Sequence, residues 1–191
     1  PRKYVGFKNY ISLFRDKDLL KSILITLYFG SMSISLEMFL GFGIALLLQK
    51  KIKGFSVFRS LILIPLMVAP VVTGFIWNLI LNPEFGSIPT FFSFLGIKFL
   101  KNFPVLANVK MVIPTIVIID AWTSTPFVVL VLLAGLQSLP VSPYEASMID
   151  GANGFQQLIY ITIPLLKPFI LVALLIRTIN VIRYFDVIFV L

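Results

Sequence analysis

Long apolar stretches alternate with short polar segments along the chain. When clusters of charged residues are taken as boundaries, the apolar stretches lie at residues 22–49, 60–81, 111–139 and 165–191. Each is at least as long as the roughly 20 residues that a helix needs to cross a bilayer. A helix also satisfies its backbone hydrogen bonds internally, which the bilayer interior requires. The pattern therefore predicts an all-α integral membrane protein, a polytopic helical bundle with four spanning helices at these positions.

Prolines interrupt two of the four predicted spans. Pro65 and Pro70 lie in the second span, and Pro114 and Pro126 lie in the third. Each proline removes a backbone hydrogen bond and favours a kink. Ordinary transmembrane kinking accounts for these prolines, and a cavity lined by bent helices, as in transporters, is the alternative.

Composition agrees with a membrane protein and removes most classes of enzyme. Hydrophobic residues make up 59% of the 191 residues and charged residues only 13%, whereas a soluble domain has about 25% charged residues. Mean hydropathy is +1.02. The chain has no Cys and no His, which excludes disulfides and every metal site or catalytic arrangement that needs either residue. We therefore expect no catalytic residue, no metal and no cofactor bound by this chain.

Charge and glycine patterns fit the same class. The net charge of +8 comes mainly from short basic clusters between apolar stretches, a placement typical of membrane proteins, so no nucleic-acid binding is expected. Gly41 and Gly43 lie within the first span and are expected to allow close packing of helices.

The polar segment after the third span predicts a first short helix. Ser142 can cap it, Pro143 suits its first position, and Glu145 completes a Ser-x-x-Glu capping box. This helix should stop near Gly151, because glycine tolerates the left-handed conformation that ends many helices.

A second short helix should follow at once. Asn153 can cap it, with Gln156 three residues later, and it should run to about Ile163. Pro164 should close it, because the residue before a proline disfavours the helical conformation. Residues 142–164 are therefore expected to form a compact helical hairpin between two spanning segments.

The same segment carries a spaced motif. The run 145–147 reads Glu-Ala-Ser, Gly151 follows after three further residues, and nine residues later 161–164 reads Ile-Thr-Ile-Pro. This resembles the signature of permease subunits of binding-protein-dependent ABC importers, in which Glu-Ala-Ala and Gly are followed by Ile-x-Leu-Pro at these spacings. Ser147 in place of Ala and Ile163 in place of Leu depart from that pattern.

Other segments resemble a narrower group, the sugar and glycerol-phosphate permeases related to the larger membrane subunit of the maltose transporter. The matching segments are 4–10, 63–77, Trp122 with 126–127, and 177–186. The resemblance covers nearly the whole chain. It implies one transmembrane permease domain over 1–191, incomplete at both ends, with at least one further helix before Pro1 and one after Leu191.

This resemblance implies a transport function. The chain is expected to span the plasma (inner) membrane several times and to import a carbohydrate or related solute by alternating access. Its expected partners are ABC ATPase subunits that use ATP and Mg, a second permease subunit, an extracytoplasmic solute-binding protein and membrane lipid. The chain has no phosphate-binding Gly-x-x-x-x-Gly-Lys-Ser/Thr pattern, so it is expected not to be an enzyme.

Two alternatives stay open at this point. One is an ABC importer permease for a non-sugar solute. The other is a secondary transporter driven by an ion gradient, with Glu37 or Asp120 as a proton relay.

The resemblance places the contacts with the ATPase in the 142–164 hairpin, which is a cytoplasmic coupling helix in the family. From the residues alone, Glu145 could simply cap its helix and Asp150 could simply shape a turn. Tyr144, Met148 and Phe155 supply apolar surface for docking. The expected coupling residues are Glu145, Ala146, Ser147, Asp150, Gly151, Ala152, Ile161 and Pro164.

The basic residues favour the opposite orientation. Segments 1–21 and 82–110 hold nine Lys or Arg, against five in 50–59 and at Lys167. The positive-inside rule would place 1–21 in the cytoplasm, whereas the resemblance places 142–164 there. We follow the signature loop.

Polar residues within the spans are candidates for the solute path. Charged side chains are costly in hydrocarbon and should face the bundle interior. Arg183 and Asp186 are three residues apart and are expected to pair near a helix end, while Arg177 is expected to share one side of the helix with Asn180 and Arg183. Trp122 and Trp77 could instead be anchors at the membrane interface. The candidate path residues are Glu37, Asn78, Asp120, Trp122, Thr125, Asn180 and Arg183.

Overall fold

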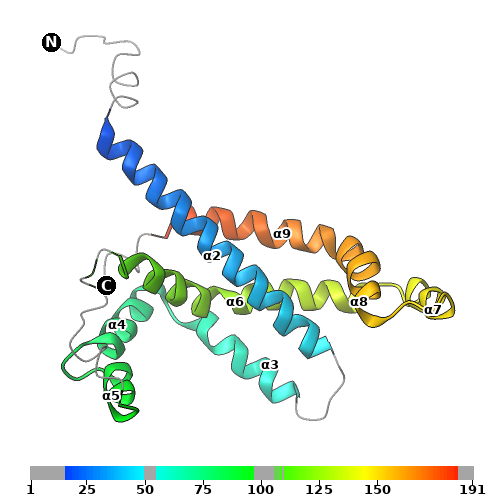
Figure 1. Cartoon of the computed structure of the whole chain (residues 1–191), viewed down its shortest axis with the longest axis horizontal. Coiled ribbons are helices and arrows are strands. Elements are labelled where there is room, and N and C mark those ends of the chain that lie inside the picture. The colour runs from blue at the N-terminus through cyan, green and yellow to red at the C-terminus, as the bar shows by residue number, and fades with distance from the viewer. Residues whose placement is uncertain (1–15, 50–54, 97–105, 107, 109, 185–191) are drawn as a thin grey trace, which may run out of the picture.

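The computed structural model describes residues 16–49, 55–96, 106, 108 and 110–184. Every regular element among these residues is helical, which confirms the predicted fold class (Figure 1). The elements in chain order are α2 (Lys17–Gln49), α3 (Phe55–Leu63), the 3₁₀ turn η1 (Ile64–Met67), α4 (Pro70–Leu81), α5 (Ser87–Phe94), α6 (Val112–Ser138), α7 (Ser142–Ile149), α8 (Gly154–Gln157), the π-helical turn η4 (Leu158–Thr162) and α9 (Ile163–Ile182).

Three long helices, α2, α6 and α9, form the centre of the molecule. Each is long and apolar enough to cross a membrane, α9 together with α8 and η4. Helix α6 is the most buried of the three: 67% of its most apolar window is buried, against 28% for α2 and 17% for the helical run that ends in α9. The first and third predicted spans are therefore helical. The fourth is helical as far as Ile182, and its residues 185–191 lie outside the described residues.

Close packing joins α2 to α6. A Cβ on Gly41 would lie 2.6 Å from Cγ1 of Val128, so this glycine lets the two backbones approach, as predicted. No described atom lies within 4 Å of a Cβ built on Gly43, so the described residues show no close packing at this second glycine. Fully buried aliphatic side chains such as Leu132 on α6 and Leu166 on α9 fill the interior around this contact.

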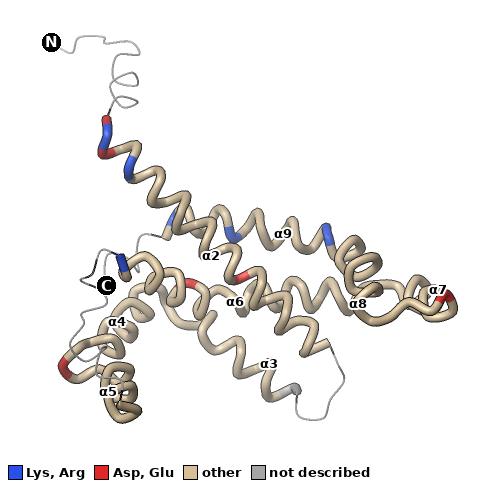
Figure 2. The backbone as a smooth tube through the Cα atoms, viewed as in Figure 1, with Lys and Arg blue, Asp and Glu red and all other residues tan. Residues whose placement is uncertain are grey.

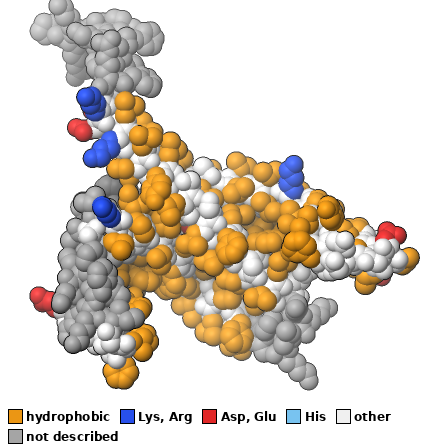
Figure 3. Space-filling model, in the orientation of Figure 1, with side chains coloured by type: hydrophobic (Ala, Val, Ile, Leu, Met, Phe, Trp, Pro, Cys, Tyr) orange, Lys and Arg blue, Asp and Glu red, His pale blue; other side chains and the backbone are white. Residues whose placement is uncertain are grey.

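The outward faces of α2 and α9 are apolar. Figure 3 shows hydrophobic side chains spread over the visible surfaces of both helices. Phe39 on α2 is 76% exposed and Leu175 on α9 is 65% exposed. Large contiguous apolar surface is unusual on a soluble monomer and typical of helices that contact lipid or other membrane helices.

The second predicted span is not one straight helix. Its two parts, Val57–Met67 and Pro70–Leu81, are bent by 98° relative to each other. Pro65 lies in the 3₁₀ turn, Val68 is extended, and Pro70 begins α4 at a position where its missing N–H is not needed. The predicted kink is confirmed, and it is sharp enough to break the span. The described chain holds three continuous spans, or four if the bent pair crosses the membrane as one.

The third predicted span contrasts with the second. Helix α6 runs without a break through both of its prolines. Pro114 lies in the first turn, where no intrahelical donor is required, and Pro126 is buried within the helix. The predicted polar loop after α4 also contains a short helix, α5, that the sequence reasoning missed. Its signal was Gly86 before Ser87, with Pro89 in the first turn.

Candidate functional site

The predicted hairpin projects at one end of the molecule, beyond α6 and α8 (Figure 1). Helix α7 ends two residues before Gly151, whose φ of 77° lies in the left-handed region, as predicted. The capping box of the second helix is also confirmed. Asn153 Oδ1 accepts a hydrogen bond from the Gln156 backbone at 2.9 Å, and Gln156 Oε1 accepts one from the Asn153 backbone at 2.8 Å.

The capping box predicted for the first helix is wrong. Val141 already has helical dihedral angles, so Ser142 lies inside the helix and makes no capping bond. The side chain of Glu145 is exposed and has no hydrogen-bond partner among the described residues. Its carboxylate is therefore free to meet another molecule.

The predicted end of the second helix at Pro164 is also wrong. The π-helical turn η4 lets the Ile163 N–H bond to the carbonyl of Leu158, five residues back. A wider turn gives room to the proline ring, which would clash with a carbonyl in a regular α-helix. Residues Gly154–Ile182 therefore form one helical run from the hairpin into the last span.

Neutral hydrogen bonds hold α7 against the base of this run. Gln157 Nε2 donates to Ser147 Oγ at 3.0 Å, and the hydroxyls of Tyr144 and Thr162 lie 3.0 Å apart. Ser147 Oγ in turn donates to the Tyr144 carbonyl at 2.7 Å. Ser147, where the signature has Ala, thus links the two arms. We call these bonds between Tyr144, Ser147, Gln157 and Thr162 the hairpin latch.

The free surface of the hairpin combines acid and apolar groups. Met148 is 61% exposed, Ile149 87% and Phe155 70%. Of the eight predicted coupling residues, four are exposed in addition to Glu145, and three are half-buried. The exposed ones are Ala146, Asp150, Gly151 and Pro164, and the half-buried ones are Ser147, Ala152 and Ile161.

A buried ionic cluster joins the three long helices. Arg177 on α9 binds Glu37 on α2 through Nε–Oε2 at 2.5 Å and Nη2–Oε1 at 2.7 Å. Its Nη2 also lies 3.1 Å from both carboxylate oxygens of Asp120 on α6. All three side chains are at least 95% buried. Figure 2 shows how few charged positions the middle of these helices carries. We call this cluster the ion triad.

A polar cavity of about 340 Å³ lies next to the ion triad. Arg177 forms part of its wall, together with two predicted path residues, Asn180 and Arg183. Ser124, which lines the cavity, donates to Asp120 Oδ1 at 3.1 Å. The remaining lining residues are Pro70, Thr123 and Tyr184. Sequence reasoning missed Pro70 and Tyr184 as lining residues. The bond between Ser124 and Asp120 could have been expected, because residues four apart on a helix are neighbours on its surface.

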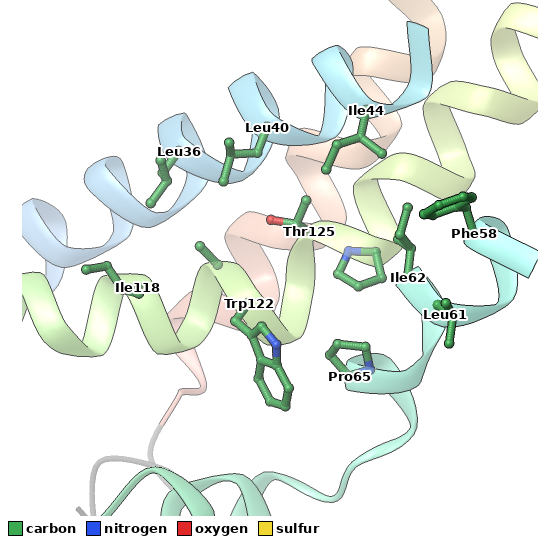
Figure 4. A pocket seen from close by; sticks show the side chains of 12 residues that line it. Leu36, Leu40, Ile44, Phe58, Leu61, Ile62, Pro65, Ile118, Trp122 and Thr125 are labelled. Carbon is green, nitrogen blue, oxygen red and sulfur yellow. The ribbon is translucent and has the colours of Figure 1, made fainter. Parts of the chain in front are cut away.

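Trp122 and Thr125 do not line the polar cavity, but a second, apolar cavity of about 620 Å³ (Figure 4). Trp122 stacks edge-on against Trp77 with ring centroids 5.7 Å apart. Figure 4 shows the cavity between three elements, with side chains from α2, α6 and the α3–η1 segment. The lining residues are Leu36, Leu40, Ile44, Phe58, Leu61, Ile62, Pro65, Ile118, Ala121, Trp122, Thr125 and Pro126.

The remaining predicted path contacts fall elsewhere. Asn78 is half-buried on α4 and lines neither cavity. The expected Arg183–Asp186 pair involves a residue outside the described part of the chain. Within the described part, no group of three or more carboxylate, His or Cys side chains could hold a metal ion.

Comparison with known sequences matches most of the chain to one family. A sequence model of the family described as "Binding-protein-dependent transport system inner membrane component" matches residues 37–191. The trehalose/maltose transport system permease protein MalF of Thermococcus litoralis is 41% identical, over 100% of this chain and 64% of that protein. The trehalose transport system permease protein SugA of Mycobacterium tuberculosis is 31% identical, over 98% and 59%. This chain therefore spans about three fifths of the length of these relatives.

Comparison of structures gives the same fold. A bacterial ABC transporter involved in the import of the acidic polysaccharide alginate has a chain that superposes with a TM-score of 0.80. The two are 23% identical, and the match covers 92% of this chain and 61% of that one. At this identity the likeness concerns the fold of the helices.

Proposed function

Because the chain belongs to the family of inner-membrane components of binding-protein-dependent transport systems, we propose that it is the permease subunit of an ATP-driven importer of a carbohydrate or related solute. In this proposal a separate ATPase hydrolyses ATP with Mg, a second permease subunit completes the pore, and an extracytoplasmic binding protein delivers the solute. The relatives named for trehalose and maltose support the choice of a carbohydrate.

The observation that carries the proposal is the hairpin between α6 and α9. It has an exposed carboxylate at Glu145, beside the apolar side chains of Met148 and Ile149. An apolar patch with a charged neighbour is typical of a protein interface. We propose that this surface lies in the cytoplasm and docks on the ATPase.

The hairpin latch would let movement of the ATPase reach the spanning helices. A flexible loop would absorb movement of the ATPase, whereas α7 is bonded to α8 and η4 at two points. The run Gly154–Ile182 then continues without a break into the last span. Movement of the ATPase would in this way tilt the spanning helices and open the solute path alternately to each side.

The polar cavity beside the ion triad is our candidate for part of the solute path. Its lining combines hydroxyl, amide and guanidinium groups, which suit the hydroxyls of a sugar. Trp122, Thr125 and Asn78 lie outside it and are not needed in this proposal.

An importer for a non-sugar solute would use the same hairpin, so cargo is tested separately. A gradient-driven transporter is not favoured, because the family couples transport to a binding protein.

The first experiment is purification of the full-length protein in mild detergent, with identification of every co-purifying chain and an assay of ATP hydrolysis. We expect a P-loop ATPase and a second hydrophobic subunit. A lone protein that moves solute under an ion gradient would contradict the proposal.

Variants test the coupling role directly. Glu145→Lys should leave a folded complex in which solute no longer stimulates ATP hydrolysis, and Gly151→Pro should do the same by distorting the turn. The matched control is Glu84→Gln, since Glu84 is exposed on the turn before α5. If the hairpin variants merely reduce expression, and the surviving complex stays coupled, the hairpin is a structural loop.

A further inference from the structure

The polar cavity has an arginine in its wall, but the carboxylates that bind this arginine lie behind it. Arg177 lines the cavity, whereas Glu37 and Asp120 do not. The carboxylate oxygens accept hydrogen bonds from Nε and Nη2 of Arg177. Among the described residues no hydrogen bond uses Nη1 of Arg177, so its N–H groups remain unused as donors.

Acidic and basic side chains around the cavity are equal in number within the described part of the chain. The two carboxylates are Glu37 from α2 and Asp120 from α6, and the two guanidinium groups are Arg177 and Arg183 from α9. Helix α4 contributes only Pro70 to the wall. An anion entering the cavity would therefore lose its hydration without meeting net positive charge.

The uncharged groups of the wall fit a different kind of solute. Thr123, Ser124, Asn180 and Tyr184 bring hydroxyl and amide groups to the cavity. The Tyr184 hydroxyl is buried and has no hydrogen-bond partner among the described residues. Together with Nη1 of Arg177, these groups can donate to and accept from the hydroxyls of a sugar.

We propose that Glu37 and Asp120 determine specificity: by neutralising Arg177, they make the polar cavity select uncharged polyhydroxylated solutes over anionic ones. Anionic solutes here means sugars that carry a carboxylate or phosphate. This inference rests on the proposed function, because the cavity must lie on the solute path. Glu37 and Asp120 act through Arg177 and do not touch the solute.

The test measures solute binding directly, so that the choice made by the binding protein does not enter. The full-length permease, with its partner subunits, is placed in nanodiscs without the solute-binding protein. Equilibrium dialysis then compares radiolabelled maltose with maltobionate, which has a similar shape and one added carboxylate. We expect the unmodified protein to bind maltose at least tenfold more tightly than maltobionate.

Charge variants separate this role from a purely structural one. Asp120→Asn and Glu37→Gln each keep a hydrogen-bond acceptor but leave the cavity with one net positive charge. Each should shift the ratio of the two affinities toward maltobionate by about tenfold. Glu84→Gln makes the same change of charge at an exposed site that does not line the cavity, and should leave the ratio unchanged.

Three results would overturn the proposal: no binding of either sugar to the unmodified protein, a preference for maltobionate, or a ratio that neither charge variant shifts. If one variant fails to fold, the ratio of the two affinities in the other variant and in the unmodified protein still tests the proposal. The proposed function fails by a different result, namely transport without any ATPase partner, whereas the dialysis experiment measures binding of the solute and not transport.

Discussion

The ion triad and the hairpin latch both fasten one helix to another, but by different chemistry. The triad joins α2, α6 and α9 through a guanidinium and two carboxylates that are at least 95% buried. The latch joins α7 to α8 and η4 through neutral hydroxyl and amide groups that are only part-buried. Removing one member of a buried ionic set leaves the others unpaired, whereas a neutral group near the surface can turn to water. The bundle interior is therefore joined rigidly, and the hairpin is joined by contacts that can be exchanged.

The largest effect should come from breaking the triad at its centre. Arg177→Leu leaves two buried carboxylates without a cation, and should lower the free energy of unfolding by about 3–5 kcal/mol. Thermal unfolding of the purified full-length protein in detergent measures this. Arg183→Leu is the control, because Arg183 is exposed and should change stability by less than about 0.5 kcal/mol. Equal effects of the two substitutions would mean that the triad does not hold the helices together.

Removing the whole triad should be less harmful than removing its centre. Glu37→Gln, Asp120→Asn and Arg177→Met together leave no buried charge, and the triple variant should recover at least about 2 kcal/mol relative to Arg177→Leu. The same unfolding measurement decides this. A triple variant that is less stable than the single one would show that the charges themselves contribute net stability.

The latch should respond more mildly. Ser147→Ala and Gln157→Ala each remove one bond between α7 and α8, and a double-mutant cycle should give a coupling of about 0.5–1.5 kcal/mol. Hydrogen exchange of the α7 amides measures the free energy of local opening of the hairpin. Thr178→Ala serves as the control, since Thr178 is exposed and bonds only within its own helix. A coupling of zero would exclude the bond as a link between the arms.

The smallest effect should come from the cap of α8. Asn153→Ala removes the capping oxygen and should destabilise the hairpin locally by about 1 kcal/mol, while Asn153→Ser should keep most of the cap. Hydrogen exchange at the Gln156 amide, which bonds to Asn153, reports the difference. Equal exchange in the two variants would contradict the role of the cap.

The features that the sequence predicted well depend on adjacent residues. Gly151 ends a helix and Asn153 caps the next one, because both outcomes are decided within three or four residues. The long helices were also predictable, since length and apolarity alone set them. The predicted cap of α7 is wrong by one residue: Ser142 was expected, but Val141 has helical dihedral angles and takes the cap position.

The features that could not be predicted depend on how the helices turn toward one another. Glu37 and Arg177 lie 140 residues apart in the chain, and their pairing follows from the rotation of α2 and α9 around α6. The sequence offered Asp186 as a nearby acid for the last helix, and gave no sign that two carboxylates would share Arg177. The continuous run through Pro164 was missed for a similar reason, because a π-helical turn has no reliable local signal.

The unbroken run from the hairpin into the last span also has a mechanical meaning. Its 29 residues make a lever about 43 Å long, at 1.5 Å of rise per residue. A tilt of only ~10° about one end of such a lever displaces the other end by about 7 Å. Arg177, near the end of this run remote from the hairpin, binds Glu37 on α2 and Asp120 on α6. We therefore expect that end to stay in place during a tilt, and the hairpin end, to which the latch fastens α7 and its Glu145, to move farther.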